Sequence, residues 1–459
     1  MKKEIVTSRA VRAPVADFPV ATRADHLLFI SGQLGLDDET GLPLESYRAL
    51  GRRPFPALGL MAPDSWEEAF VAQASRMYEN LDALFSEHGS DKSNLLFYSI
   101  YVRDMRNFPV IVRTRSALFE GRVAPPSTAS QVPGLLYPGA LVYFDPVAMI
   151  PNPAQQLARS VLTARCLDQG PLSNYELGTR VGAHTFYAGV VGAHPETGLI
   201  VHGANELTDA EWQRPAGGLA ERRMREPVSA QTFTIYKLFR TMLEEHGLNF
   251  ADLLKINIYL RSMADLPEME RLANEFFGTA RPAAGIIAVE SLARRDFLIE
   301  IEGIAASRGA VTRLAGNAGD WAPYAQATRG DGLIFVTATP GVRGADAVVV
   351  AGTGDLPGDA QGLVQRAIAG LRIELASQRA AAAQTYLALD RIRTALGRLD
   401  SRLSNLLKIT VYLRDMRDFA FVHAVARAML ADDPPAISVL AVADLPLAAA
   451  RVEIEAVAV

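Results

Sequence analysis

The chain carries one set of sequence landmarks three times, always in the same order. Ala72-Gln73, Ala230-Gln231 and Ala383-Gln384 each open an amphipathic stretch, at offsets of 158 and 153 residues. IYVRDM, IYLRSM and VYLRDM follow at the same two offsets, and ALVYFDPVAM, FLIEIEGIAA and ARVEIEAVAV close the three stretches at offsets of 157 and 153. Chance matches would drift, and the period is too long for a solenoid unit. Each copy is therefore predicted to be a domain with its own core.

The length of 459 residues fits three domains of about 150 residues each. The predicted domains are residues 1–152, 170–306 and 311–459, with 153–169 as a linker. We call them the first, second and third segments.

Every segment has the same predicted order of elements. An apolar strand leads through a turn-rich stretch to a long helix of period 3.6, such as AQTFTIYKLFRTMLEEHG. A second strand, a second helix and two more strands follow. This order predicts an α+β domain with one sheet and two helices on one of its faces.

The closing strand VEIEAVAV indicates what the other face of the sheet meets. Its apolar positions alternate with Glu453 and Glu455, so that one face suits the helices and the other is mixed polar and apolar. A mixed face meets either water or a neighbouring sheet. Three copies in one chain favour sheets that pack against one another.

Composition excludes several classes of function. A net charge of -5 gives no excess of positive charge for nucleic acid or an anionic membrane surface. No stretch has the roughly 18 consecutive apolar residues of a membrane helix, and the start of the chain lacks the apolar core of an export signal. A single cysteine fits a reducing compartment. We expect a cytoplasmic protein with a small-molecule ligand or substrate and no nucleic-acid or membrane partner, and self-association of the full chain stays open.

Cofactor and metal motifs are missing from the sequence. The seven histidines show no i, i+4 pair and no carboxylate at ligand spacing. Neither a P-loop nor a dinucleotide fingerprint occurs. No cofactor and no metal are expected.

Taken together, FISGQL with DDETG, WAPYAQA, LKITVYLRDMRDF and VEIEAVAV resemble the Rid family (also called YjgF), the enamine/imine deaminases. The resemblance covers essentially the whole chain, three times over. It implies a chorismate-mutase-like fold, in which three subunits pack their sheets into a barrel with helices outside and small-molecule sites between subunits. A fused triple copy is then expected to be a single-chain pseudo-trimer around a central barrel.

The resemblance also implies roles for particular positions. In deaminating members, an arginine in Pro-Ala-Arg-Ser binds the substrate carboxylate through a bidentate pair, and a glutamate on the last strand positions the attacking water. A tyrosine and a serine come from the neighbouring subunit. The arginine position aligns here with Ser127, Ala284 and Ile437, so all three segments lack it. Arg281, three residues before Ala284, is an alternative source of the same charge.

The remaining positions give the candidate site residues. The glutamate aligns with Glu300 and Glu453, which are the predicted catalytic residues, and with Tyr143 in the first segment. The tyrosine aligns with Tyr175, Tyr324 and Phe18, the serine with Ser31, Ala188 and Ala338, and an asparagine position with Val112, Glu270 and His423. The predicted substrate-binding residues are Tyr175, Tyr324, Ser31, Tyr143 and His423. Because the tyrosine and serine should come from a neighbour, Glu300 is expected to meet either Tyr324 or Phe18 with Ser31, and Glu453 either Phe18 with Ser31 or Tyr175.

Other interpretations stay open at this stage. Glutamates two apart on a strand, such as Glu300 and Glu302, are more often a solvated sheet face than an acid/base pair, and buried tyrosines are often only packed aromatics. The favoured function is hydrolysis or proton transfer at a C=N or C=C bond, on a substrate unlike the usual keto-acid imines because the carboxylate-binding arginine is absent. The alternative is a non-catalytic ligand-binding or regulatory protein. RNA cleavage, a third activity attached to the family name, is disfavoured by the charge balance.

Two long inserts and one alanine-rich run depart from the family pattern. Residues 41–72 and 198–230, which contain Phe55, Trp66 and Trp212, are predicted to be ordered covers near the sites. The run QRAIAGLRIELASQRAAAA in the third segment predicts additional helix.

Overall fold

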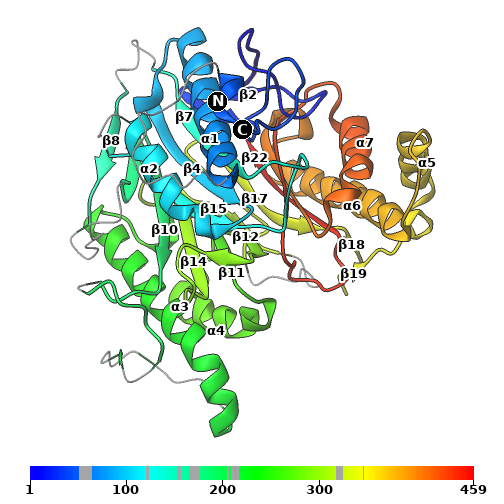
Figure 1. Cartoon of the computed structure of the whole chain (residues 1–459). Helices are drawn as coiled ribbons and strands as arrows, with labels where there is room; N and C mark the ends of the chain where they lie inside the picture. Colours follow the sequence, from blue (N-terminus) through cyan, green and yellow to red (C-terminus); the bar gives the residue numbers. More distant parts are fainter. Residues whose placement is uncertain are drawn as a thin grey trace.

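Three extended sheets form the interior of the computed structural model, and the helices lie on the outside (Figure 1). The structure describes residues 1–459 except 51–64, 120–122, 152–156, 165–174, 196, 204–205, 208–211, 213–216, 317–323 and 345. Phe55 lies outside the described residues, as does the side chain of Trp66.

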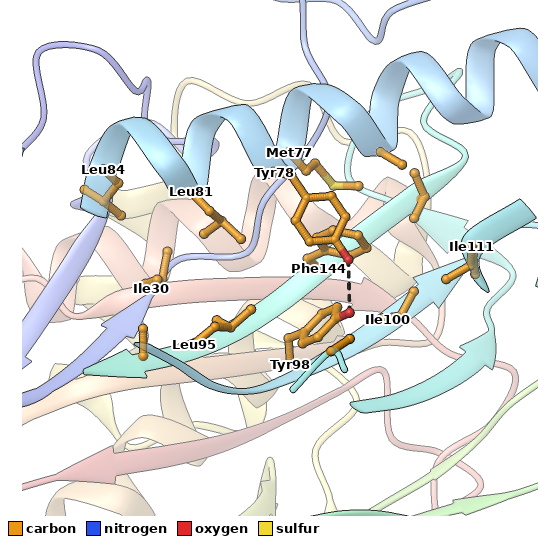
Figure 2. Close-up of a cluster of buried hydrophobic side chains, with 14 of the residues drawn as sticks. Ile30, Met77, Tyr78, Leu81, Leu84, Leu95, Tyr98, Ile100, Ile111 and Phe144 are labelled. Carbon is orange, nitrogen blue, oxygen red and sulfur yellow. Dashed lines mark hydrogen bonds between the residues drawn. The ribbon is translucent and has the colours of Figure 1, made fainter. Parts of the chain in front are cut away.

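The first sheet has the strand order β1-β2-β3-β7-β4-β5-β13. Its own strands are β1 (Lys3–Val6), β2 (Ala21–Ala24), β3 (Leu27–Ile30), β4 (Leu95–Val102), β5 (Ser127–Gln131) and β7 (Val142–Met149). The helices α1 (Ser65–Glu87) and α2 (Phe108–Leu118) cover one of its faces. Figure 2 shows Met77, Tyr78 and Leu81 of α1 directed at the strands, where the Tyr78 and Tyr98 hydroxyls are hydrogen bonded at 3.0 Å.

The second sheet has the order β12-β11-β14-β10-β9-β8. Its strands are β8 (Arg159–Leu162), β9 (Gly178–Val181), β10 (His184–Val191), β11 (Leu253–Leu260), β12 (Ala283–Ala288) and β14 (Ile299–Ala305). The helices α3 (Leu219–Glu245) and α4 (Leu266–Phe277) pack on it. β8 lies within 153–169, so part of the predicted linker is an edge strand of this sheet.

The third sheet has the order β15-β16-β17-β22-β20-β21-β6. Its own strands are β15 (Thr312–Leu314), β16 (Ala327–Gly330), β17 (Leu333–Pro340), β20 (Leu406–Leu413), β21 (Ala436–Ala441) and β22 (Val452–Ala458). The helices α6 (Ala376–Gly397) and α7 (Phe419–Leu430) cover one face, and α5 (Gly358–Ile368) is an additional helix. The alanine-rich run at 365–383 covers only the end of α5, then the non-helical residues 369–375 and the start of α6, so the predicted additional helix is confirmed but lies mostly before the run. A small hairpin of β18 (Val342–Arg343) and β19 (Val348–Val349) precedes α5.

The face of each sheet away from its helices meets the other sheets. Leu27, Phe97, Phe186, Leu333 and Val457, drawn from all three segments, belong to one buried cluster. On β22, Ile454 faces the helices, whereas Lys255 of the second sheet forms an ion pair with Glu455 at 2.6 Å. The prediction that the mixed face meets neighbouring sheets is confirmed.

Three short antiparallel contacts join the segments in a cycle. β13 (Ser291–Leu292) of the second segment pairs with β5 of the first. Asp444 of the third segment bridges to Ala288 of the second, and β6 (Gly134–Leu135) of the first pairs with β21 of the third. Within the described residues the strands make these three sheets and the β18–β19 hairpin without closing a barrel, so the expected central barrel is not confirmed. The result is a mixed α+β fold.

Candidate functional site

The strand registers give the candidate positions the same place in every sheet. Ser127 pairs with Tyr98, Ala284 with Ile256 and Ile437 with Ile409 across equivalent parallel strand pairs. No arginine therefore stands at this strand position in any of the three sheets.

Glu300 lies on β14 at the contact between the second and first segments. It is only 5% exposed, and its Oε2 has no hydrogen-bond partner in the described part of the chain. Burial, together with the charge of the adjacent Glu302, raises the pKa of Glu300 to about 8. A carboxyl with this pKa can both give and take a proton near neutral pH, which is what general acid/base chemistry needs.

A glycine on the neighbouring strand makes room for this carboxyl. A Cβ atom at Gly189 of β10 would lie 2.1 Å from Glu300 Oε1 and 2.7 Å from Thr128 Oγ1. Only a residue without a side chain leaves that space to Glu300. The same measurement places Glu300 beside Thr128, a residue of the first segment.

Tyr175 joins Glu300 at this contact. It forms a parallel bridge with Ala124 of the first segment, and it is half-buried. Burial raises the pKa of Tyr175 to about 12, with the Glu300 charge adding to the rise and the Arg115 charge opposing it. The hydroxyl thus stays protonated and can donate a hydrogen bond.

Arg115, on α2, supplies a buried positive charge that the sequence analysis missed. Its guanidinium carbon lies 5.2 Å from the Tyr175 ring centroid, and its Nη1 donates to Ser127 Oγ at 2.9 Å. The guanidinium therefore sits next to the strand position where relatives are expected to carry their arginine. The equivalent helical positions are Ala273 and Ala426. The only available signal was one arginine on the otherwise apolar face of a helix.

The expected pairing of glutamate and tyrosine across segments is wrong. Glu300 and Tyr175 both belong to the second segment, and the first segment contributes Ser127 and Arg115. The reason is local. The chain just after Tyr175 runs alongside β10 of the same segment, where the Ala188 amide donates to the Leu177 carbonyl at 2.9 Å. Strand β10 in turn pairs with β14, which carries Glu300.

The contact between the second and third segments has an equivalent tyrosine and glutamate but takes its arginine from a different position. Arg281 lies over the Tyr324 ring, with 5.8 Å from guanidinium carbon to centroid. Arg281 thus brings a positive charge to this contact from a position other than the strand position where the family carries its arginine. It lies next to the half-buried Glu270, and burial raises the pKa of Glu270. The corresponding strand glutamate, Glu453, is fully buried, and neither of its oxygens has a partner in the described residues. Burial raises the pKa of Glu453 well above its ordinary value.

The serine equivalent in the third segment is Thr337 and not Ala338, as the alignment had it. Thr337 Oγ1 accepts the Ala284 amide at 3.0 Å and donates to the Ala325 carbonyl at 2.5 Å. Ser31 makes the same two bonds, from the Ile437 amide at 2.9 Å and to the Pro19 carbonyl at 2.7 Å. The third segment is one residue shorter here than the alignment assumed. In both copies the hydroxyl ties two segments together.

The contact between the third and first segments has no carboxyl at the strand position. Tyr143 is buried there, its hydroxyl accepts the Val439 amide at 3.2 Å, and a Cβ at Gly32 would lie 1.5 Å from that oxygen. His423 lies against Phe18, with ring centroids 5.8 Å apart, and its Nε2 is 2.9 Å from the Ala16 carbonyl oxygen. The structure therefore brings Tyr143, Ser31 and His423 to one contact, and their role in substrate binding stays a prediction.

The inserts and the remaining groups add little to these contacts. Trp212, from the second insert, packs edge-on against Phe233 of α3 at 5.4 Å. Among the described residues, no three His, Cys, Asp or Glu side chains are arranged to hold a metal ion. None of the described helices is long and apolar enough to cross a membrane.

Comparisons with known proteins agree with the family that the sequence motifs indicate. The model of the family described as endoribonuclease L-PSP matches residues 215–307 and 320–459, just over half of the chain. A RutC family protein of Pyrococcus abyssi is 30% identical over 135 residues, which are 29% of this chain and 87% of that protein. The 3-aminoacrylate deaminase RutC of Acinetobacter baylyi is 25% identical over 150 residues, 33% of this chain and all of that protein. A mouse 2-iminobutanoate/2-iminopropanoate deaminase is 30% identical over 133 residues, 29% of this chain and 82% of its own length.

Two solved structures are similar over different lengths. A putative endoribonuclease of Thermotoga maritima covers 33% of this chain and 99% of its own, with 26% identity and a TM-score of 0.26. A chorismatase covers 80% of this chain and 94% of its own, with 15% identity and a TM-score of 0.46. The match to the family model shows that this chain belongs to the endoribonuclease L-PSP family, which is the Rid/YjgF family.

Proposed function

We propose that this chain hydrolyses imines or enamines of small molecules, and that Glu300, at the contact between the first and second segments, is the acid/base group. The observation that carries the proposal is a buried carboxyl with an unpartnered oxygen and a pKa near neutrality, beside a half-buried tyrosine and a buried arginine. Deaminase names among the relatives support the reaction class.

The chemistry follows from the protonation of Glu300. At a pH below its pKa of about 8, Glu300 is mostly protonated, so it can donate its proton to the carbon of an enamine or to the nitrogen of an imine. The resulting carboxylate then takes a proton from the water that attacks the imine carbon, which gives a carbinolamine. Return of that proton to the amine nitrogen lets ammonia leave, and the hydroxyl proton passes to the carboxylate as the carbonyl product forms. Tyr175, whose raised pKa keeps the hydroxyl protonated, is proposed to donate a hydrogen bond to the substrate.

The substrate is proposed to differ from those held through a strand arginine. That position is Ser127, and the nearby guanidinium of Arg115 already donates to it. A bidentate pair with a substrate carboxylate needs two free parallel donors in a fixed geometry. Imines with and without a carboxylate are therefore the informative comparison.

The three segments are proposed to act as a single-chain pseudo-trimer with unequal sites. The cyclic strand contacts support this arrangement. The first segment offers Tyr143 in place of the glutamate, so at most two contacts can use glutamate chemistry. Of these, the Glu300 contact has the half-buried tyrosine, whereas both Tyr324 and Glu453 are buried.

The test is ammonia release from imines generated in situ by an amino-acid oxidase, measured for the whole chain and for Glu300→Gln. Loss of an acid/base group lowers the rate about 10²–10⁴-fold. Arg115→Lys keeps the positive charge but loses the two parallel N–H donors of the guanidinium. A change of KM in this variant therefore reports on substrate orientation. Full activity in Glu300→Gln would reject the assignment, and absence of turnover with saturable imine binding would favour the non-catalytic ligand-binding alternative.

A further inference from the structure

A second set of buried charges lies where the inner faces of the three sheets meet, away from Glu300, Tyr175 and Arg115. Each sheet contributes one acid from its last strand: Asp145, Glu302 and Glu455. These residues line one cavity of about 70 Å³ together with Asn257, Lys255 and Lys408. Its volume is enough for one small ion or several water molecules.

Two of the three acids are neutralised by a lysine of the preceding segment. Lys255 of the second segment pairs with Glu455 of the third at 2.6 Å. Lys408 of the third segment pairs with Asp145 of the first and also donates to the Ile30 carbonyl at 2.7 Å. Both lysines are nearly buried, so the two pairs are shielded from water.

The third acid has no such lysine because the equivalent residue is Phe97. Phe97, Lys255 and Lys408 all follow the same irregularity in strand pairing, opposite Val147, Ile304 and Val457. The lysine position of the second segment faces the acid of the third, and that of the third faces the acid of the first. By the same rule, the Phe97 position of the first segment faces Glu302 of the second. Glu302 Oε1 accepts from Asn257 at 2.7 Å and from Ser99 at 3.4 Å, but these neutral donors carry no charge.

Three acceptor oxygens of the cavity have no partner in the described residues. They are Glu302 Oε2, Glu455 Oε2 and Asn257 Oδ1, and Glu302 is only 4% exposed. A Cβ at Gly285 would lie 2.5 Å from Glu455 Oε2 and 2.6 Å from Asn257 Oδ1, so a missing side chain opens the space beside two of them. The equivalent residue in the third segment, Ser438, has a hydroxyl that donates to Asp145 at 2.7 Å. The cavity therefore lacks one cation and one donor relative to its own internal symmetry.

We propose that the cavity binds one small monovalent cation of ammonium or potassium size, held by Glu302, Glu455 and Asn257 in place of the missing third lysine. An unpaired buried carboxylate is costly unless a counter-charge reaches it. Ammonium matches best, because it carries the same N–H donors as a lysine side chain. Burial raises the pKa of Glu302 to about 7, so the carboxylate that binds the cation is favoured above that pH.

The experiment compares thermal unfolding of the whole chain at pH 8 in ammonium chloride, potassium chloride and choline chloride at equal ionic strength. A ligand that binds only the folded chain raises the Tm with its concentration. We expect a saturable rise of the Tm in ammonium or potassium beyond that in choline. Equal responses to all three salts would overturn the proposal, because Glu302 would then be held only as the neutral acid.

Two variants locate the effect. Phe97→Lys restores the third lysine and should abolish the cation-specific rise, whereas the matched Phe97→Leu should keep it. Glu302→Gln should also abolish it and guards against failure of the lysine variant to fold. A cation-specific rise that survives in Glu302→Gln would place the ion elsewhere and reject this site.

Discussion

Individual residues decide which of the three segment contacts can work. Glu300 and Glu453 occupy equivalent strand positions, yet Glu300 has a half-buried tyrosine beside it and Glu453 is sealed among buried groups. A buried carboxyl with both oxygens unpartnered lowers stability, and we propose that Glu453 takes no part in turnover. The same residue type therefore has two different consequences in one chain.

Glu453→Gln should consequently leave turnover of the imine substrates within about twofold. Glutamine does not ionise, so the variant escapes the cost that the raised pKa of Glu453 imposes on the folded state, and it should unfold at a higher temperature than the unchanged chain at pH 8.5. Activity assays and thermal unfolding on the same preparation check both. A large loss of activity would move the catalytic role to the contact between the second and third segments.

Gly189 is the position where a single methyl group should disable the site without unfolding the chain. In Gly189→Ala the added Cβ would collide with Glu300 Oε1, and the carboxyl must turn away from its present place. We expect a loss of turnover of about 10²-fold or more, as for a misplaced acid/base group. Gly358→Ala, where a Cβ meets nothing within 4 Å, is the matched control. Equal activity of the two variants would contradict the role of Glu300.

At the scale of elements, the repeated landmarks were enough to predict one sheet and two helices in each segment. The offsets preserve register, and register sets which face of a strand is buried. Three details differed from the prediction, and two of them depended on contacts that no offset encodes. Glu300 does not meet a tyrosine of a neighbouring segment, because the stretch after Tyr175 runs along the sheet of its own segment. The serine equivalent is Thr337, one residue before the aligned Ala338. Arg115 reaches the site from a helix.

The signal for Thr337 was present in the sequence. Gly192 and Gly341 both lie against the glutamine of the Ala-Gln landmark, Gln231 or Gln384, within the long helix. Counting back from these glycines aligns Thr337 with Ala188. No comparable signal marks Arg115, because its position can be recognised only when Ser127 and Tyr175 are seen beside it.

The additional helix α5 gives a prediction about the third segment. Val364 of α5 is fully buried in a cluster with residues of α6 and α7. Val364→Ala should lower the free energy of unfolding by about 1–2 kcal/mol through lost burial and the cavity left behind. Gln365→Ala, on the exposed side of the same helix, should change it by less than about 0.5 kcal/mol. Chemical denaturation measures both, and equal effects would mean that α5 is not held by this cluster.

At the scale of the whole molecule, buried carboxyls make stability depend on pH. Burial raises the pKa of Glu300 to about 8 and of Glu302 to about 7, from an ordinary value of 4.5. Between these limits the unfolded chain has released protons that the folded chain still holds, so the free energy of unfolding falls as pH rises. We expect the Tm to be lower at pH 8.5 than at pH 6.5, with a smaller difference in Glu300→Gln and an unchanged one in the exposed Glu39→Gln. A Tm that increases over this interval would contradict the assignment.

Charge at the same scale gives a prediction about partners. The family description names an endoribonuclease, whereas this chain has a net charge of -5. Neutralising phosphates needs clustered positive charge, and such binding weakens steeply with salt. Filter binding at physiological salt should show no sub-micromolar affinity for RNA. A tight, salt-sensitive complex would reopen the nuclease interpretation.

The pairing of β6 with β21 has a consequence for synthesis on the ribosome. Leu135 finds its strand partner at Leu440, and the Gly32 amide donates to the Ile437 carbonyl at 3.0 Å. Translation at about 5–20 residues per second leaves the first segment without these partners for roughly 15–60 s. During that time its inner apolar face, including Phe29 and Phe97, is exposed in the nascent chain. The first segment to be made is thus among the last to be completed, and chaperones have their longest opportunity there.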